Sequence, residues 1–226
     1  MSARNWIAKT KSYIKEVPLE QVDSKYSQGL AVSVVRGRYQ LYTDKVIYSY
    51  EDLYHNFRVT CNKIDWKLFK PKDILILGLG LGSVIQLIEK KNKHQLRFTA
   101  VDIDEMSFYL TQKYTSEKFR SPIEYINTDA ELFVAQSKQK YDLIVFDIFI
   151  DDKIPTHLQS LRFMKKLAHR LSPDGVILMN RIAMEPDQIM ENMQFMEYIF
   201  KKVWPMASVI DVPPNWVLIS NEMVLK

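Results

Sequence analysis

The chain has 226 residues, of which 47% are hydrophobic and 26% charged, and its formal net charge is +4. This composition is typical of a folded globular protein and excludes disorder along the whole chain. The charge is small and no basic stripe is interleaved with aromatic residues, so we expect no nucleic-acid partner.

The N-terminal part of the chain predicts a small antiparallel β-meander. Residues 1–28 show no clear pattern, but short runs of β-branched and aromatic residues follow over 30–50, separated by turns that contain Gly or Asp. A helix is expected over 51–64, and Pro71 marks the entry to a larger domain. We therefore divide the chain into an N-terminal extension with the meander, residues 1–64, and a main domain, residues 65–226.

The main domain alternates apolar runs with amphipathic stretches of helical length, which predicts a mostly parallel sheet covered by helices. The strands are expected at 74–77, 96–103, 123–126, 141–148 and 176–180. The helices are expected at 84–91, 106–114, 130–136, 158–171 and 187–202.

Two final strands joined by Pro213-Pro214-Asn215 predict a hairpin that adds one antiparallel strand at the end of the sheet. The predicted fold class is therefore α/β: a Rossmann-like, mostly parallel sheet with an antiparallel C-terminal hairpin strand, preceded by the meander.

A glycine-rich turn follows the first strand of this sheet. Gly78, Gly80 and Gly82 come directly after the apolar run, and a helix begins at Val84. The order of strand, glycine turn and helix is the context of a nucleotide-binding loop. Small residues let the backbone approach a ligand, and the free amides of the helix N-terminus favour a polar or anionic group. Such a turn also occurs for packing alone, so the motif needs support from other residues.

Acidic residues end three successive strands: Asp102, Asp129 and Asp147. In an open parallel sheet the ligand lies outside the carboxyl ends of the strands. Asp102 follows Gly82 by 20 residues, the separation at which an acid reaches ribose hydroxyls. Each acid alone could instead cap the helix that follows it. The three acids together with the glycine turn favour a ligand site.

These residues lie in segments that resemble a known family. From about residue 26 to 221 the chain is similar to the spermidine synthase-like branch of the S-adenosylmethionine-dependent methyltransferase fold. Tyr54 and His55 stand at the family's Tyr-His pair, and V-D-I-D-E is similar to its V-E-I-D-E. Two further similar segments are N-T-D-A-E-L-F-V and F-D-I-F-I-D-D-K-I-P-T-H-L.

The resemblance implies a role for each site residue. The three glycines of the turn would shape the S-adenosylmethionine pocket, Asp102 would bind the ribose and Asp129 the adenine amino group. Asp147 and Tyr54 would face the acceptor. The next residues along the chain, Ile103 and Ala130, are counted with the cofactor-binding set. A homodimer contact through the meander is a further implication of the resemblance.

Two departures from the family bear on the reaction. Authentic aminopropyltransferases have the loop G-G-G-D-G-G, whose Asp holds the ammonium of decarboxylated S-adenosylmethionine; Leu81 stands at that position here. A carboxylate there would also repel the carboxylate of intact S-adenosylmethionine, and Leu81 would not. The D-S-x-D-P-x-G-P segment is absent too, because Ile150 is the third residue after Asp147.

We therefore expect a methyltransferase-like enzyme that uses S-adenosylmethionine and acts on a small acceptor. Asp147 is the candidate for orienting or deprotonating this acceptor, and Asp151 or Asp152 would add charge that favours a cationic amine. One alternative is an aminopropyltransferase that uses decarboxylated S-adenosylmethionine, and another is a non-catalytic ligand-binding protein of the same fold. A dinucleotide dehydrogenase fits the closing hairpin poorly.

The rest of the sequence limits other classes of site. The one cysteine, Cys61, excludes an internal disulfide and is expected to be a passive buried thiol. His157 matches the family's I-P-x-H-L segment, but no cluster of residues has metal-ligand spacing, so no metal is expected. No apolar run reaches the roughly 18 residues of a membrane span, and the N-terminus lacks the apolar core of a secretory signal. A cytoplasmic location without membrane contact is the simplest expectation.

Overall fold

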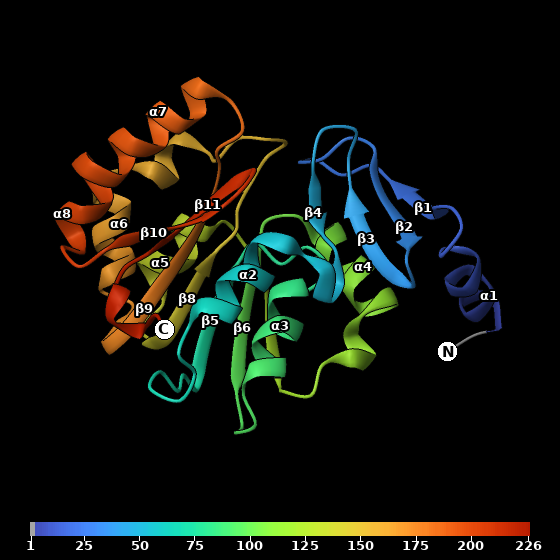
Figure 1. The fold of residues 1–226 in the computed structure, drawn as a ribbon, viewed down its shortest axis with the longest axis horizontal. Helices are drawn as coiled ribbons and strands as arrows, with labels where there is room; N and C mark the ends of the chain where they lie inside the picture. Colours follow the sequence, from blue (N-terminus) through green and yellow to red (C-terminus); the bar gives the residue numbers. More distant parts are fainter. Residues whose placement is uncertain (1–2) are drawn as a thin grey trace.

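The computed structural model describes residues 3–226, which form two β-sheets and the helices around them (Figure 1). The smaller sheet is antiparallel throughout, with the order β1-β2-β3-β4, and it confirms the predicted meander. Its strands are β1 (Val17–Val22), β2 (Leu30–Val35), β3 (Arg38–Tyr42) and β4 (Ile47–Ser49).

Helix α1 (Ala3–Lys11) and strand β1 lie in the stretch where the sequence shows no clear pattern. β1 carries Pro18 and a register shift between Pro18 and Glu20, so its residues show no strict alternation. Proline is tolerated there because β1 is an edge strand, with one side free of ladder bonds.

The larger sheet has seven strands in the order β10-β11-β9-β8-β5-β6-β7. The five strands from β9 to β7 are parallel, as predicted. β11 is antiparallel to both β9 and β10, so the antiparallel strand lies one place in from the edge rather than at the end. The strands are β5 (Asp73–Leu77), β6 (Arg97–Asp102), β7 (Ile123–Asn127), β8 (Tyr141–Phe146), β9 (Leu171–Ile182), β10 (Ser208–Val212) and β11 (Asn215–Ile219).

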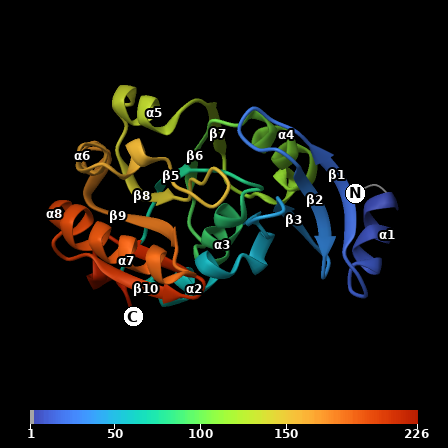
Figure 2. The ribbon, with the colours of Figure 1, turned by 90° about the horizontal axis from the view of Figure 1, so that it is seen from above.

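Helices cover both faces of this sheet, with α5 on one side and α3 on the other (Figure 2). Alternate side chains of β5 show the two faces: Ile74 and Ile76 share a core with α2 and α3, whereas Leu75 and Leu77 share one with α5 and α6. A strand buried on both faces explains the continuous apolar run. The helices are α2 (His55–Lys63), α3 (Ser83–Lys91), α4 (Glu105–Tyr114), α5 (Ala130–Gln136), α6 (Leu161–Ala168), α7 (Pro186–Phe195) and α8 (Lys201–Val203).

The bounds of three predicted helices and of one predicted strand differ in the structure. The helix expected over 51–64 is a 3-10 turn followed by α2, and a π-helical turn, Met196–Phe200, separates α7 from α8. The helix expected over 158–171 is a 3-10 turn and then α6, whose N-terminus is capped by the Ser160 hydroxyl. The S-P-D-G segment after α6 belongs to β9, because Leu171 already pairs with Tyr141 and a register shift takes up the extra residues.

The division of the chain at residues 64 and 65 remains a prediction. Helix α2, which precedes residue 65, packs against the larger sheet. Its residues Phe57 and Cys61 are fully buried in the core that contains β5 and α3. Burial raises the pKa of the Cys61 thiol to about 12, so it is neutral and unreactive. Within residues 3–226, none of the helices is long and apolar enough to cross a membrane.

Candidate active site

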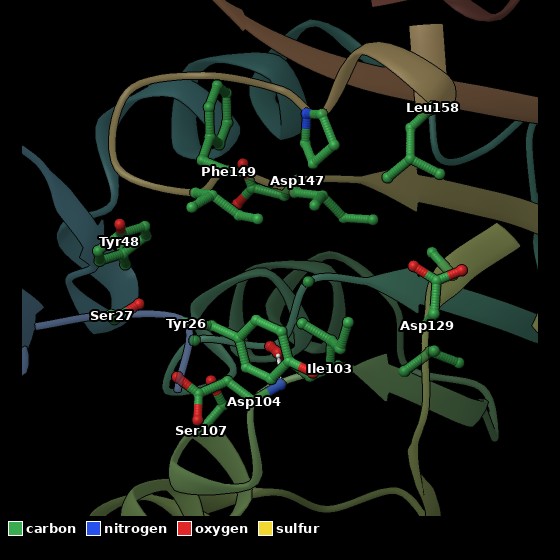
Figure 3. Close-up of a pocket in the computed structure, with 18 of the residues that line it drawn as sticks. Tyr26, Ser27, Tyr48, Ile103, Asp104, Ser107, Asp129, Asp147, Phe149 and Leu158 are labelled. Atoms are coloured by element: carbon green, nitrogen blue, oxygen red, sulfur yellow. Dashed lines mark hydrogen bonds between the residues drawn. The ribbon is translucent and has the colours of Figure 1, made fainter. Parts of the chain in front are cut away.

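Two cavities meet at Asp147. The strand-end cavity, about 150 Å³, lies at the carboxyl ends of β5, β6 and β8, and Gly78, Asp102 and Asp129 are among its lining residues. The meander cavity, about 460 Å³, lies between the β3–β4 hairpin and the ends of β9 and β11, and Tyr54 is among its lining residues. Figure 3 shows the strand-end cavity, with Asp147 and Phe149 on one side, Tyr26 and Asp104 on the opposite side, and Asp129 farther along.

The backbone of Asp147 is fixed by the strand that precedes the glycine turn. Its N–H donates to the Leu77 carbonyl (2.8 Å), which continues the ladder between β8 and β5 past the end of β8. A Cβ on Gly78 would lie 2.2 Å from the carbonyl oxygen of Asp147, and Gly78 has φ +90°. Glycine is therefore required at residue 78 for both its conformation and its close approach to Asp147.

The carboxylate of Asp147 accepts two side-chain hydrogen bonds. The Tyr54 hydroxyl donates to Oδ2 (3.1 Å) and the Asn180 amide donates to Oδ1 (2.8 Å). Burial raises the pKa of Asp147 to about 7, even though these two donors favour the ionised form. At neutral pH the group is therefore close to half-ionised, as a general base that works near pH 7 should be.

The structure brings the predicted pair of Asp147 and Tyr54 together across 93 residues of sequence. Burial and the neighbouring Asp147 raise the pKa of Tyr54 well above 10, so its hydroxyl stays protonated and acts as a donor. Asp151, predicted with them, lines the meander cavity but binds elsewhere: Lys45 Nζ lies 2.7 Å from its Oδ2. Asp151 therefore lines the cavity as part of an ion pair with Lys45 of the meander.

Asp102 and Ile103, both predicted from the sequence as cofactor-binding residues, line the strand-end cavity. Asp102 Oδ2 accepts the N–H of Leu79 (2.8 Å) and its Oδ1 the N–H of Asp104 (2.9 Å). Burial raises the pKa of Asp102, and the two amides oppose that change. The carboxylate thus holds the glycine turn in place, while each oxygen keeps acceptor capacity for a ligand hydroxyl.

Asp129 combines the two interpretations that the sequence left open. Its Oδ1 accepts the N–H of Leu132 (3.0 Å) and caps α5, while Asp129 and Ala130 both line the strand-end cavity. His157 Nε2 lies 3.8 Å from Asp129 Oδ2, at the same end of the cavity. A capping carboxylate can therefore also face a ligand here.

The glycine turn is only partly at the cavity surface. Gly80 is among the lining residues together with Gly78, whereas Gly82 is the N-cap of α3, where a Cβ would lie 2.4 Å from the Phe119 ring. Leu81 is fully buried and belongs to the core that the meander shares with α4. In the described part of the chain Leu81 lines neither cavity, so the inference drawn from its position in the family's loop is not supported.

Several lining residues were missed in the sequence. Tyr26 and Ser27 reach the strand-end cavity from the loop between β1 and β2, and Tyr48 lies at both cavities from β4 (Figure 3). The Ser24 hydroxyl fastens this loop to Asp104 Oδ2 (2.5 Å). No local motif marks these residues, because their place at the site depends on how the meander packs on the larger sheet.

The sequence profile of the spermine/spermidine synthase domain family matches residues 51–222. The chain belongs to this family. A polyamine aminopropyltransferase of Saccharolobus solfataricus is 30% identical over 181 residues, which are 76% of this chain and 56% of that relative. Relatives from Bifidobacterium longum and Vibrio vulnificus are matched over 23% and 38% of their own length. The chain thus spans from about a quarter to just over half of the length of the curated relatives it matches.

Solved structures of low sequence identity share the fold of this spermine/spermidine synthase family member. A probable spermidine synthase from Corynebacterium glutamicum has a TM-score of 0.73 at 15% identity, over 90% of this chain and 80% of that one. A spermidine synthase in complex with the transition-state analogue AdoDATO has a TM-score of 0.63 at 17% identity, over 88% and 72% of the two chains. The family resemblance and the Rossmann-like fold expected from the sequence are therefore confirmed.

Proposed function

We propose that this chain transfers an aminopropyl group from decarboxylated S-adenosylmethionine to an amine acceptor. The family profile and the relatives named polyamine aminopropyltransferase favour this reaction over the methyl transfer expected from the sequence. The expectation of methyl transfer depended on Leu81, and Leu81 lies in a core rather than at a cavity.

The charge of the strand-end cavity carries the proposal. Asp102, Asp104, Asp129 and Asp147 line it, and none of its described lining residues is lysine or arginine. A donor with only cationic groups suits such a lining, whereas the carboxylate of intact S-adenosylmethionine would meet four acids and no fixed cation. The N–H of Leu79 is not free for that carboxylate, because it already binds Asp102.

The N–H groups of Gly78 and Gly82 are engaged too, with the carbonyls of Val101 and Leu79. Three amides of the turn thus bind protein acceptors rather than facing the cavity. The residues fit a donor that has lost its carboxylate better than one that retains it.

The meander cavity suits an alkylammonium acceptor. Aromatic rings attract ammonium groups through their faces, and acids attract them by charge. The aromatic lining residues are Tyr42, Tyr48, Tyr50, Tyr54 and Phe149, and the acidic ones are Asp44, Asp147 and Asp151. An amine that enters from this side reaches Asp147, where the two cavities meet.

When bound, decarboxylated S-adenosylmethionine would supply a carbon activated by its sulfonium leaving group. Asp147 would accept the proton that the acceptor nitrogen loses as the new N–C bond forms and the C–S bond breaks. Tyr54 and Asn180 hold the carboxylate between the cavities through their hydrogen bonds. Orientation of the two reactants contributes most of the remaining acceleration, because the sulfonium needs no further activation.

Titration calorimetry with decarboxylated and intact S-adenosylmethionine tests the proposal. We expect the decarboxylated form to bind at least ~10-fold more tightly, equivalent to about 1.4 kcal/mol. Mass spectrometry of a putrescine incubation should then show an added aminopropyl group. Tighter binding of the intact form, together with a methylated product, would overturn the proposal. Binding of neither form would point to a non-catalytic protein.

A further inference from the structure

We propose that the C-terminal hairpin positions the Asp147 carboxylate: Asn215 fixes the orientation of the Asn180 amide, and Asn180 holds Asp147 toward the acceptor. This inference rests on the proposed function, because it assigns Asn180 and Asn215 as positioning residues for that reaction. It gives the closing strands of the sheet a role in the site beyond completing the fold.

The register of three neighbouring strands brings these side chains together. β8 and β9 are parallel and pair Phe146 with Met179, so the next residues, Asp147 and Asn180, stand side by side. β11 is antiparallel to β9 and pairs Asn215 with Ile182. Asn215 is therefore the diagonal neighbour of Asn180 on the same face of the sheet, within reach of a side-chain hydrogen bond.

The hydrogen bonds form a directed chain. Asn215 Nδ2 donates to Asn180 Oδ1 (3.0 Å), and Asn180 Nδ2 donates to Asp147 Oδ1 (2.8 Å). An amide has one accepting end and one donating end, so the bond from Asn215 determines which end of Asn180 faces the carboxylate. With Asn215 in the same orientation, an inverted Asn180 would place its oxygen against Asp147 and its N–H groups against those of Asn215. Asn180 is almost completely buried, so water offers little compensation for that arrangement.

This chain of amides favours the ionised form of Asp147 against the effect of burial. A hydrogen-bond donor to a carboxylate lowers its pKa, and an acceptor placed there raises it. Loss of the bond from Asn215 frees Asn180 to invert part of the time. An acceptor in place of Asn215 would compete with Asp147 for the N–H end of Asn180 and so favour the inverted amide more than simple loss of the bond.

Other ionisable groups share the two cavities with Asp147. On the meander side they are Tyr42, Asp44, Lys45, Tyr48, Tyr50, Tyr54, His55 and Asp151. On the strand-end side they are Tyr26, Tyr48, Asp102, Asp104, Asp129 and His157. None of them is changed in the variants below, so they form a constant background.

The test is a titration of the Asp147 carboxyl carbon by NMR in the whole protein, assigned by its loss in Asp147→Asn. The key variant is Asn215→Asp, which presents only acceptor oxygens to Asn180. We expect its Asp147 to titrate about one pH unit above wild type, equivalent to ~10-fold less ionised form at pH 6. Asn215→Ala should raise the pKa of Asp147 by a smaller amount, because it removes the hydrogen bond from Asn215 without favouring the inverted orientation of the Asn180 amide.

Met184→Asp separates this effect from simple charge repulsion, because Met184 also lines the meander cavity. A shift in Asn215→Asp no larger than in Met184→Asp, or none in Asn215→Ala, would overturn the proposal. The NMR readout needs no turnover, so it distinguishes failure of the positioning role from failure of the proposed reaction. Where transfer is measurable, the acidic limb of the pH–rate profile should shift by the same amount, with donor affinity unchanged.

Discussion

The two cavities that meet at Asp147 fix their acidic side chains in different ways. In the strand-end cavity main-chain N–H groups hold two of them: Asp102 accepts the N–H groups of Leu79 and Asp104, and Asp129 accepts that of Leu132. At the meander cavity side chains from distant segments hold them, such as Tyr54 on Asp147 and Lys45 on Asp151. The first arrangement uses main-chain groups near the strand ends, whereas the second depends on which distant segments pack together. We therefore expect substitutions to separate donor binding from acceptor chemistry.

The largest effect is expected for Asp147→Asn, at the junction of the cavities. An amide cannot take the acceptor's proton, so kcat should fall by roughly 10³-fold, within the range usual for loss of a general base. Donor affinity, measured by calorimetry, should change by less than about 3-fold, because strand-end acids remain. A strong loss of donor binding would show that Asp147 belongs to the donor side instead.

The same substitution should stabilise the protein above neutral pH. Burial raises the pKa of folded Asp147 to about 7, above the value of about 3.9 for an unfolded aspartate. The folded state therefore binds more protons between these values, and wild-type stability falls as the pH rises from about 4 to 7. The neutral amide of the variant has no such dependence, so thermal unfolding at pH 8 should show a gain on the order of 2 kcal/mol that disappears near pH 4.

A smaller effect, confined to the donor side, is expected for Asp129→Asn. Asparagine caps a helix about as well as aspartate, so α5 and the melting temperature should be preserved. The lost charge should weaken donor binding by ~10-fold and leave the acceptor KM unchanged. Calorimetry and steady-state kinetics on the same preparation check both points. An altered acceptor KM with normal donor affinity would contradict the division between the cavities.

The smallest effect is expected for Lys45→Met, confined to the acceptor side. The Lys45–Asp151 ion pair is largely exposed, so its removal should change stability little. An unpaired Asp151 can attract a cationic amine, so the acceptor KM should fall by ~3-fold at low salt, with less effect at high salt. Lys93→Met, which changes an exposed lysine that lines neither cavity, is the matched control. Equal KM changes in the two variants would show that only net charge matters.

The glycine turn and the strand-end acids were predictable because their signals are local in sequence. The run Ile74 to Leu77 predicts a strand buried on both faces, and Asp102 and Asp129 directly follow strands whose carboxyl ends meet at one edge. The predicted capping role and ligand role of Asp129 prove compatible, because capping uses only one of its oxygens.

Other residues were unpredictable on both sides of the site, for physical reasons that differ between them. Asn180 and Asn215 become neighbours only through the register of β9 with β11, which a single sequence does not show. Tyr26 lies in a polar loop without periodicity. The direction of Leu81 was misjudged because it stands between Gly80 and Gly82, both at positive φ, where neither helical nor strand periodicity sets the direction of a side chain.

The contact between the glycine turn and β4 has a mechanical consequence. A Cβ on Gly80 would lie 3.1 Å from that of Ser49, whose hydroxyl is 2.6 Å from that of Ser83 at the start of α3. Ser83 also accepts the N–H of Tyr50 (3.0 Å), and Thr111 of α4 donates to the carbonyl of Gly80 (2.7 Å). The turn is thereby packed between the meander and α4, so substitutions in either element are expected to displace the backbone that lines the strand-end cavity.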